Sequence, residues 1–202
     1  MPRDLVSKRS IRRSLKVNTL LLALGGNIRG PWGNPRETLL RACRELAAAG
    51  VEMVRSSNFY VTEPVGGGRQ PCYLNAVVLA RTGIAPGTLL RLLKQIERRA
   101  GRRIAPRMSP RPLDIDILDY GGRRIGRRAV GPRRHGQLIL PHPELAGRAF
   151  VLRPLLDVAP AWQHPILGQP AKLLLSQLNP PKRAAVQQTL DSATNSCEKI
   201  SK

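Results

Sequence analysis

Apolar residues gather in short blocks along the chain, and the pattern within each block indicates an element. The block from Leu20 to Leu24 is continuously aliphatic, as in a strand that is covered on both faces. Residues 51–61 and 73–82 contain the β-branched and aromatic residues that are typical of strands. The pattern predicts three strands in these positions.

Two further segments carry apolar residues at helical spacing and have the start and stop signals of helices. In the first, Asn34 suits the N-cap, Pro35 the first helical position and Glu37 the capping-box position. The second begins at Pro86 and ends in basic residues. A glycine follows each segment, as it often follows a helix.

A strict alternation of acidic and aliphatic residues follows the second predicted helix. In a strand, Leu113, Ile115 and Ile117 would point to one face. Asp114 and Asp116 would share the other face, roughly 6–7 Å apart along the backbone. Two like charges so placed repel unless a positive group lies between them. A solvated strand edge is the simpler interpretation of such a pair, but the arginines that precede it favour a site for cations beside anions.

The order strand, helix, strand, strand, helix, strand predicts an α+β fold. We expect a ferredoxin-like split βαβ sandwich, an antiparallel sheet with helices on one face. The other face is left for a ligand or for further chain. The C-terminal additions expected are a long hairpin or loop at residues 121–136, short extended pieces at 138–143 and 148–152, and a final helix at 171–178.

The chain carries a formal charge of +21, which would attract polyanions such as nucleic acid, anionic lipid or nucleotide phosphates. We divide it into a basic flexible arm at residues 1–17, one domain at 18–178 and a disordered tail at 179–202. The arm also has some features of a transit peptide, although an untargeted arm is the preferred interpretation. Aromatic residues make up only 3% of the chain, which argues against a reader of stacked RNA bases.

Three widely spaced cysteines, Cys43, Cys72 and Cys197, support neither a zinc site nor a disulfide framework. A reducing compartment, and hence a cytoplasmic location, is the simplest inference. No apolar run approaches the length of a membrane span, so no membrane association is expected.

Six short motifs occur together in the chain. They are Leu24-Gly25-Gly26-Asn27, Phe59-Tyr60-x-Thr62-x-Pro64, Tyr73-Leu74-Asn75-Ala76, Pro110-Arg111-x-Leu113-Asp114-Ile115-Asp116-Ile117, Pro141-His142 and Arg148-x-Phe150. In this order and spacing, over about residues 20–178, they resemble the 6-hydroxymethyl-7,8-dihydropterin pyrophosphokinases of folate biosynthesis. That resemblance implies transfer of the β,γ-diphosphate of ATP to the hydroxymethyl group of the dihydropterin, with release of AMP.

The resemblance also implies roles for residues on the ATP side. Asp114 and Asp116 would bind two magnesium ions, and Arg107 and Arg111 would join them as catalytic residues. The ATP-binding residues implied are Glu97, Arg102, Arg103, Arg107, Arg111, Ile117, His142 and Arg148. No general base stands out, which agrees with a phosphoryl transfer that depends on positioning and charge.

On the pterin side, Tyr73 and Phe150 would stack on the ring and Asn75 would read its polar edge. The full set implied is Gly25, Asn27, Thr62, Pro64, Val65, Tyr73, Asn75 and Phe150. We expect a monomer that binds these small-molecule substrates, with other folate enzymes as candidate partners.

Two other classes of function stay open from the sequence. One is a ferredoxin-like RNA-binding protein, suggested by the charge, although its exposed aromatics are missing and specific nucleic-acid binding is not expected. The other is a metal-dependent nuclease, for which Asp119 is the one further acidic residue nearby.

Overall fold

The computed structural model describes residues 17–64, 70–106, 108–126, 137–180 and 186–188. The predicted basic arm and most of the predicted tail therefore lie outside the described residues. The elements are β1 (Asn18–Gly26), α1 (Pro35–Ala48), β2 (Val51–Ser56), β3 (Tyr60–Thr62), β4 (Tyr73–Thr82), α2 (Pro86–Arg99), β5 (Asp114–Tyr120), η1 (Leu145–Gly147), α3 (Ala149–Val158), α4 (Ala171–Gln177) and β6 (Val186–Gln188).

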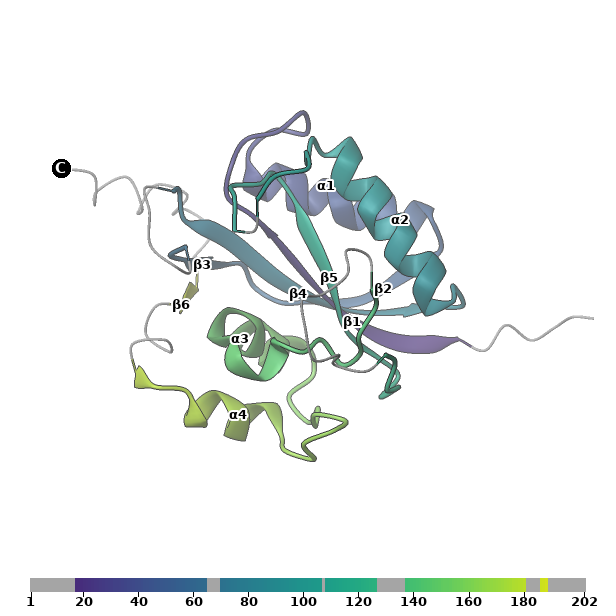
Figure 1. The fold of residues 1–202 in the computed structure, drawn as a ribbon, viewed down its shortest axis with the longest axis vertical. Coiled ribbons are helices and arrows are strands. Elements are labelled where there is room, and N and C mark those ends of the chain that lie inside the picture. Colours follow the sequence, from purple (N-terminus) through teal and green to yellow (C-terminus); the bar gives the residue numbers. More distant parts are fainter. Residues whose placement is uncertain (1–16, 65–69, 107, 127–136, 181–185, 189–202) are drawn as a thin grey trace, which may run out of the picture.

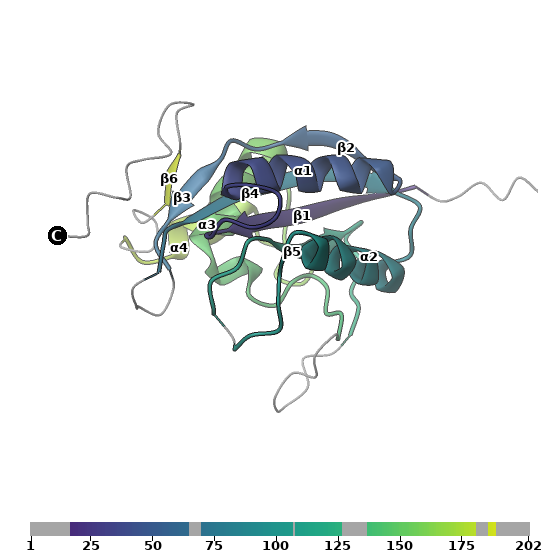
Figure 2. The ribbon, with the colours of Figure 1, turned by 90° about the horizontal axis from the view of Figure 1, so that it is seen from above.

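One antiparallel sheet forms the centre of the molecule, with strand order β5-β1-β4-β3-β6 and with β2 also paired to β4. Helices α1 and α2 cover one face, and α3 and α4 lie against the other (Figures 1 and 2). The protein is thus a mixed α/β structure with an antiparallel sheet, as the sequence predicted.

The aliphatic run in β1 follows from this layering. Leu20, Leu22 and Leu24 enter the core under α1 and α2. Leu21 enters the second core, under α3 and α4. Because both faces of β1 are buried, polar residues are absent from its centre, and the interpretation of this run as a doubly covered strand is confirmed.

Helix α1 begins as predicted. The Asn34 side chain accepts a hydrogen bond from the Glu37 backbone N–H at 3.0 Å, and Glu37 Oε2 accepts one from the Asn34 N–H at 2.8 Å. Helix α2 begins at Pro86 but has Ala85 at its N-cap, with no side-chain hydrogen bond to its first turn. Both predicted helices are confirmed.

Three predictions about elements are wrong. Residues 148–152 were expected to be extended but begin α3, because Val151, Leu152 and Leu155 form a helical stripe against the sheet. The strand expected at residues 51–61 is two strands, β2 and β3, with a break between them. The tail expected to be disordered contains β6, which pairs with β3.

The prediction of a final helix near the C-terminus is confirmed. The predicted final helix is α4, one residue shorter than expected. Residues 127–136 of the predicted hairpin lie outside the described residues, and the chain on either side is joined by paired backbone hydrogen bonds between Ile125 and Leu140 at 2.9 and 3.0 Å. Cys72 is disulfide-bonded and Cys43 is a free cysteine, so the inference of a reducing compartment from unpaired cysteines loses its basis.

Candidate active site

The alternation in β5 divides its side chains as predicted. Leu113, Ile115 and Ile117 are buried in the core under α1 and α2. Asp114 and Asp116 lie on the opposite face, with side chains 26% and 34% exposed. The two carboxylates therefore share one face of the sheet, at the edge strand of the β5-β1-β4 order.

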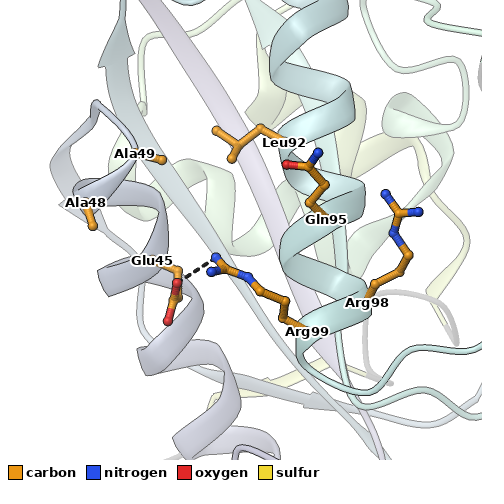
Figure 3. A pocket seen from close by; sticks show the side chains of 7 residues that line it. All are labelled: Glu45, Ala48, Ala49, Leu92, Gln95, Arg98 and Arg99. Carbon is orange, nitrogen blue, oxygen red and sulfur yellow. Dashed lines mark hydrogen bonds and ion pairs between the residues drawn. The ribbon is translucent and has the colours of Figure 1, made fainter.

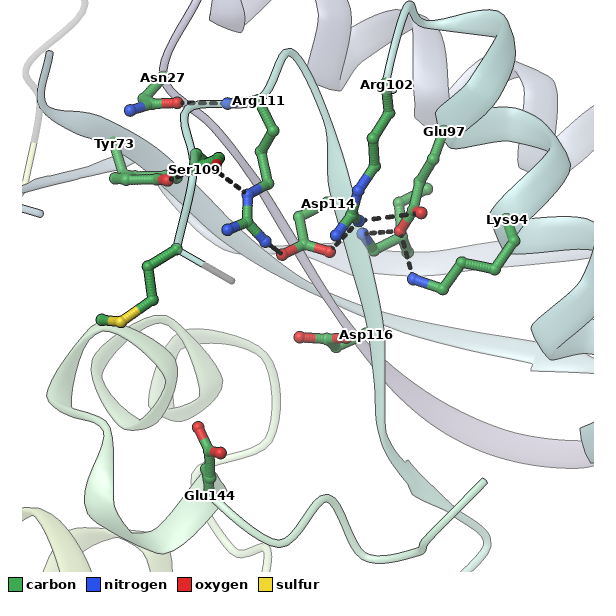
Figure 4. A network of polar contacts seen from close by, with 12 residues as sticks. Asn27, Tyr73, Lys94, Glu97, Arg102, Ser109, Arg111, Asp114, Asp116 and Glu144 are labelled. Carbon is green, nitrogen blue, oxygen red and sulfur yellow. Dashed lines mark hydrogen bonds and ion pairs between the residues drawn. The ribbon is translucent and has the colours of Figure 1, made fainter. Parts of the chain in front are cut away.

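Among the described residues, arginines form ion pairs with Asp114, whereas the ion-pair partner of Asp116 is His142 (Figure 4 shows the arginines). Arg111 Nη1 lies 2.7 Å from one carboxylate oxygen of Asp114, and Arg102 Nη1 contacts the other. The same Arg102 nitrogen lies 2.9 Å from Glu97, which also receives Lys94 Nζ at 2.7 Å. These side chains therefore form a continuous network of ion pairs, with alternating positive and negative groups, that connects α2 to β5.

This network shifts the pKa values of both acids. Burial alone would raise the pKa of Asp114, but Arg102 and Arg111 outweigh it and hold that pKa below its ordinary value. Burial raises the pKa of Glu97, and Lys94 and Arg102 offset only part of the rise. Glu97 Oε1 also accepts a hydrogen bond from the Ile115 backbone N–H at 2.8 Å, so this buried acid fixes α2 to β5 one residue after Asp114.

Asn27 fixes the start of the acidic strand rather than facing a ligand. Its side-chain oxygen accepts a hydrogen bond from the Arg111 N–H at 2.8 Å, and its own N–H donates to the Arg111 carbonyl at 3.0 Å. Its amide nitrogen donates to the Pro71 carbonyl at 3.2 Å. The Asn27 side chain is therefore already committed to the protein, and a direct contact with the pterin is not supported.

The loop before β5 is also bound to the segment that leads into β4. The Tyr73 hydroxyl donates to the Ser109 carbonyl at 3.4 Å, and Gln70 Nε2 donates to the Met108 carbonyl at 3.1 Å. Met108 has a positive φ of 68°, a conformation that costs energy for a side chain of its size. The residues expected to bind pterin and those expected to bind ATP are thus joined through the backbone of this loop.

Most of the residues expected to bind pterin gather on the sheet face that carries the acids. The ladder aligns Gly25 with Asn75 on one side and with Asp114 on the other. The amide nitrogen of Asn75 donates to the buried Thr62 hydroxyl at 2.8 Å. Thr62 thus orients Asn75 and has little surface of its own to offer a ligand. Pro64 lies just beyond β3, and Val65 lies outside the described residues.

The segment that enters α3 brings further predicted residues to this side. His142 Nε2 lies 4.0 Å from Asp116 Oδ2, and its Nδ1 accepts a hydrogen bond from the Glu144 N–H at 3.3 Å. Arg148 forms an ion pair with Glu144 and lies over the ring of Phe150, 5.5 Å from its centroid. His142, Arg148 and Phe150 therefore occupy one short stretch opposite the sheet.

Some predicted residues are not brought to the site. Ile117 is 3% exposed and its side chain packs in the core on the other face of the sheet, away from the acids. Arg103 is exposed in the loop after α2, without a described contact to the acids. Arg107 lies outside the described residues.

Three contacting residues were missed from the sequence. Lys94 and Glu144 pair with Glu97 and Arg148 at helical spacings of three and four, which is a signal that the sequence did contain. Gln70 follows a glycine-rich stretch, and nothing in the sequence indicates its contact with Met108.

The donor set suits magnesium better than zinc. Within the described ranges, no group of three or more His, Cys, Asp and Glu residues could hold a metal ion. Magnesium needs only one or two carboxylates when phosphate oxygens and water complete its shell. Asp114 and Asp116, on one strand face with His142 nearby, fit that requirement.

A groove of about 590 Å³ lies elsewhere, between α1 and α2 (Figure 3). Ala48 and Leu92 line it, and Arg99 crosses it to bind Glu45 at 2.6 Å. Since α1 and α2 cover the face opposite the acids, the sheet separates this groove from Asp114 and Asp116. No residue predicted for either substrate lines it.

A family model described as 7,8-dihydro-6-hydroxymethylpterin-pyrophosphokinase (HPPK) matches residues 21–160. The chain belongs to this family. The resemblance found in the motifs is therefore confirmed. Neither the RNA-binding nor the nuclease alternative is supported by this membership.

Relatives with the corresponding name occur in bacteria. A 2-amino-4-hydroxy-6-hydroxymethyldihydropteridine pyrophosphokinase from Synechocystis is 36% identical over 160 residues, which are 79% of this chain and 75% of that protein. One from Bacillus subtilis is 38% identical over 143 residues, which are 70% of this chain and 78% of that protein.

Longer relatives contain the family as one part. A mitochondrial folate synthesis bifunctional protein from Arabidopsis thaliana is 42% identical over 139 residues, which are 69% of this chain but 23% of that protein. A crystal structure of wild-type HPPK-DHPS from Plasmodium falciparum aligns with a TM-score of 0.60 at 16% identity, over 80% of this chain and 44% of that one. At this identity the alignment shows the fold alone. In the described part of this HPPK-family chain, no helix has the length and hydrophobicity needed to cross a bilayer.

Proposed function

We propose that the chain transfers the β,γ-diphosphate of ATP to the hydroxymethyl group of 6-hydroxymethyl-7,8-dihydropterin in folate biosynthesis and releases AMP. The observation that carries the proposal is the shared sheet face. Asp114 and Asp116 lie there on β5, with arginines around Asp114, and Tyr73 and Asn75 lie two strands away on β4. Family membership over residues 21–160 supports the same reaction.

The reaction needs positioning and charge more than covalent help. The hydroxymethyl oxygen attacks the β-phosphorus of ATP, the bond from that phosphorus to the bridging α–β oxygen breaks, and AMP leaves with the bond electrons. The hydroxyl proton passes to solvent. The protein must hold the two substrates in line and offset the negative charge on the phosphates.

Asp114 and Asp116 would hold magnesium, with two ions expected. Divalent ions at such a site neutralise charge on the attacking and leaving oxygens. Both oxygens of Asp114 face arginines in the structure, so ion binding would require Arg102 and Arg111 to exchange this carboxylate for phosphate. Arginine suits that exchange, because its planar fork fits carboxylate and phosphate equally.

Other residues would bind ATP without taking part in the bond changes. His142 lies near Asp116 and Arg148 near the start of α3, where each would contact phosphate. Glu97 is buried beside Arg102 and would act on the nucleotide indirectly, through its ion pair with that arginine. Arg103 and Arg107 are proposed for ATP from the resemblance alone, and Arg107 also for catalysis.

The pterin would lie between Tyr73 and Phe150, with the Asn75 amide at its polar edge. Thr62 fixes that amide from behind. Gly25 leaves room beside it, since a Cβ on Gly25 would lie 2.8 Å from Asn75 Oδ1. Pro64 and Val65 are proposed for this side from the resemblance.

The wider expectations also stay proposals. The order β5-β1-β4 with β2 on β4 supports the ferredoxin-like split βαβ description. A monomeric state and a cytoplasmic location are also proposed. Some relatives are named as bifunctional folate proteins, which supports other folate enzymes as partners.

The decisive experiment incubates the purified protein with ATP, magnesium and the hydroxymethyl-dihydropterin. AMP and the pterin diphosphate should appear in equal amounts, and omission of the pterin should abolish both. Absence of AMP above background would contradict the proposal. RNA offered in place of the pterin serves as the control for the alternative function.

A further inference from the structure

After α4 the chain returns to the sheet and adds a strand to its edge. β6 pairs antiparallel with β3 and aligns Val186 with Thr62. β3 has only three residues, and its other side pairs with β4. A three-residue strand with a single neighbour is weakly held, whereas β3 has a ladder on both sides.

β3 in turn positions the amide proposed for the pterin edge. The Thr62 hydroxyl accepts the hydrogen bond from Asn75 Nδ2 at 2.8 Å, and Thr62 is 6% exposed. Any shift of β3 therefore changes the orientation of Asn75. β6 lies one strand away from this contact.

Side-chain packing leads from β6 to the same subsite by a second route. Val186 is 8% exposed and forms a buried cluster with Tyr60 and Ala149. Phe150, the aromatic residue proposed to stack on the pterin, packs against this cluster. Gln187, the next residue in β6, is exposed and does not belong to the cluster.

We infer that β6 is a positioning element of the pterin subsite, which holds Thr62 through the β3 ladder and Phe150 through the cluster around Val186. The inference rests on the proposed function and goes beyond it, because the family match ends at residue 160 and β6 lies after it. The acids and their arginines lie at β5, the opposite end of the strand order. Effects of β6 should therefore be larger on the pterin than on ATP, which β6 would reach only through Arg148 beside Phe150.

The test compares Val186→Ala with the matched control Gln187→Ala in the full-length protein. Val186→Ala removes two methyl groups and should raise KM for the dihydropterin by up to about fifteenfold, the factor that corresponds to two buried methylene groups. KM for ATP should change by a smaller factor than KM for the dihydropterin, and kcat should stay at the wild-type value. Gln187→Ala should leave both KM values unchanged. Equal changes in the two KM values, or equal effects of the two variants, would overturn the inference.

A double-mutant cycle tests whether the effect passes through the aromatic residue. In a Phe150→Leu background, the further loss on Val186→Ala should shrink, because residues that act through one another are not additive. If the effects of the two substitutions on KM for the dihydropterin are fully additive in free energy, Phe150 does not transmit the effect of β6. If Val186→Ala lowers the thermal midpoint, the same comparison is made at a temperature at which circular dichroism shows both variants to be fully folded.

Binding measured through the pterin's own fluorescence separates the two proposals. If the wild-type protein releases no AMP, the proposed reaction fails, while the binding comparison still tests β6. If AMP is released but Val186→Ala binds pterin as tightly as Gln187→Ala, only the inference about β6 fails.

Discussion

At the scale of single residues, Asp114 shows how two opposing effects are resolved. Partial burial disfavours its charge, yet Arg102 and Arg111 hold its pKa below the ordinary range. The folded state therefore favours the ionised form. Its contribution to stability is present above the unfolded pKa of about 4 and is lost as the pH falls through the lower folded value. The carboxylate is fully charged wherever the proposed reaction would run.

Replacement of this charge should abolish turnover without unfolding the protein. We expect Asp114→Asn to lower kcat about a hundredfold or more, because charge stabilisation at the phosphates is lost. AMP release measures the rate, and circular dichroism checks the fold. Glu52→Gln, an exposed acid-to-amide change on β2, is the control. A variant that keeps more than about a tenth of the wild-type rate would refute the proposed metal site.

Tyr60 gives a prediction that depends on pH. Burial, and then the nearby Asp157 carboxylate, raises the pKa of Tyr60 to about 12. Its hydroxyl donates to Asp157 at 3.1 Å. Because the folded pKa is raised, the stabilisation is fully present below the unfolded value of about 10 and is lost as the pH rises from 10 towards 12.

Tyr60→Phe should therefore destabilise the protein by about 1 kcal/mol at neutral pH, the usual net worth of a hydrogen bond. Denaturant unfolding at neutral pH measures the loss, and the difference from wild type should narrow above pH 10. Ultraviolet titration should lose a tyrosinate step at about pH 12. A loss that is independent of pH would contradict the role assigned to the hydroxyl.

The sequence predicted which residues share the site face better than which residues they contact. The two-residue period of a strand is enough to place Asp114 with Asp116 and Tyr73 with Asn75. It could not show that Asn27 is committed to the Arg111 backbone, or that Gln70 contacts Met108. Those partners are chosen only when distant loops meet.

At the scale of elements, the sequence predicted a helix correctly where the helix carries its own local start signals. Helix α1 carries its own start in Asn34-Pro35-Arg36-Glu37, and both capping-box hydrogen bonds form. Helix α3 has no capping side chain and contains Pro154, so nothing local indicates a helix. Its helical form depends on packing Val151 and Leu155 against the sheet, which is tertiary information.

The cap of α1 should make a measurable contribution. Asn34→Ala should lower the free energy of unfolding by about 1 kcal/mol, because a helix N–H loses its acceptor. Chemical denaturation measures the change. An unchanged midpoint would show that solvent replaces the cap without cost.

Helix α2 lacks a capping side chain at its N-terminus, so the opposite experiment, the addition of a cap, can be made there. Ala85 has the extended backbone of an N-cap, with φ −60° and ψ 145°, but no side-chain acceptor. Ala85→Ser should stabilise the protein by about 0.5 kcal/mol or more, since serine is a preferred N-cap. A destabilised variant in the same unfolding assay would show that the site cannot accommodate the hydroxyl.

At the scale of the whole molecule, the charge of +21 acts on one substrate more than the other. ATP is a polyanion, and the pterin is close to neutral. The field of the protein should speed the approach of ATP, and salt screens such a field over about 10 Å at 0.1 M. The positive charge, which could also attract nucleic acid, would on this account increase the rate at which ATP reaches the site.

Salt should therefore lower kcat/KM for ATP several-fold over a physiological range while kcat/KM for the dihydropterin changes little. Initial rates with each substrate varied in turn measure the two constants. Chloride and acetate salts at equal ionic strength should act alike if screening is the cause. A larger effect of one anion would indicate competition at the arginines instead.

The close approach of Gly26 to the loop before β5 limits how this protein can vary. A Cβ at Gly26 would lie 2.2 Å from the Pro112 carbonyl oxygen, which is backbone and cannot rotate away. At the neighbouring Gly25 the nearest atom to an added Cβ would be Asn75 Oδ1, a side-chain atom at 2.8 Å, with the Leu74 carbonyl oxygen at 3.7 Å. A side chain at Gly25 would therefore narrow the pterin side and displace the Asn75 amide. One residue further along, a single added carbon atom would push apart the strand ends that bring the two substrates within reach of each other.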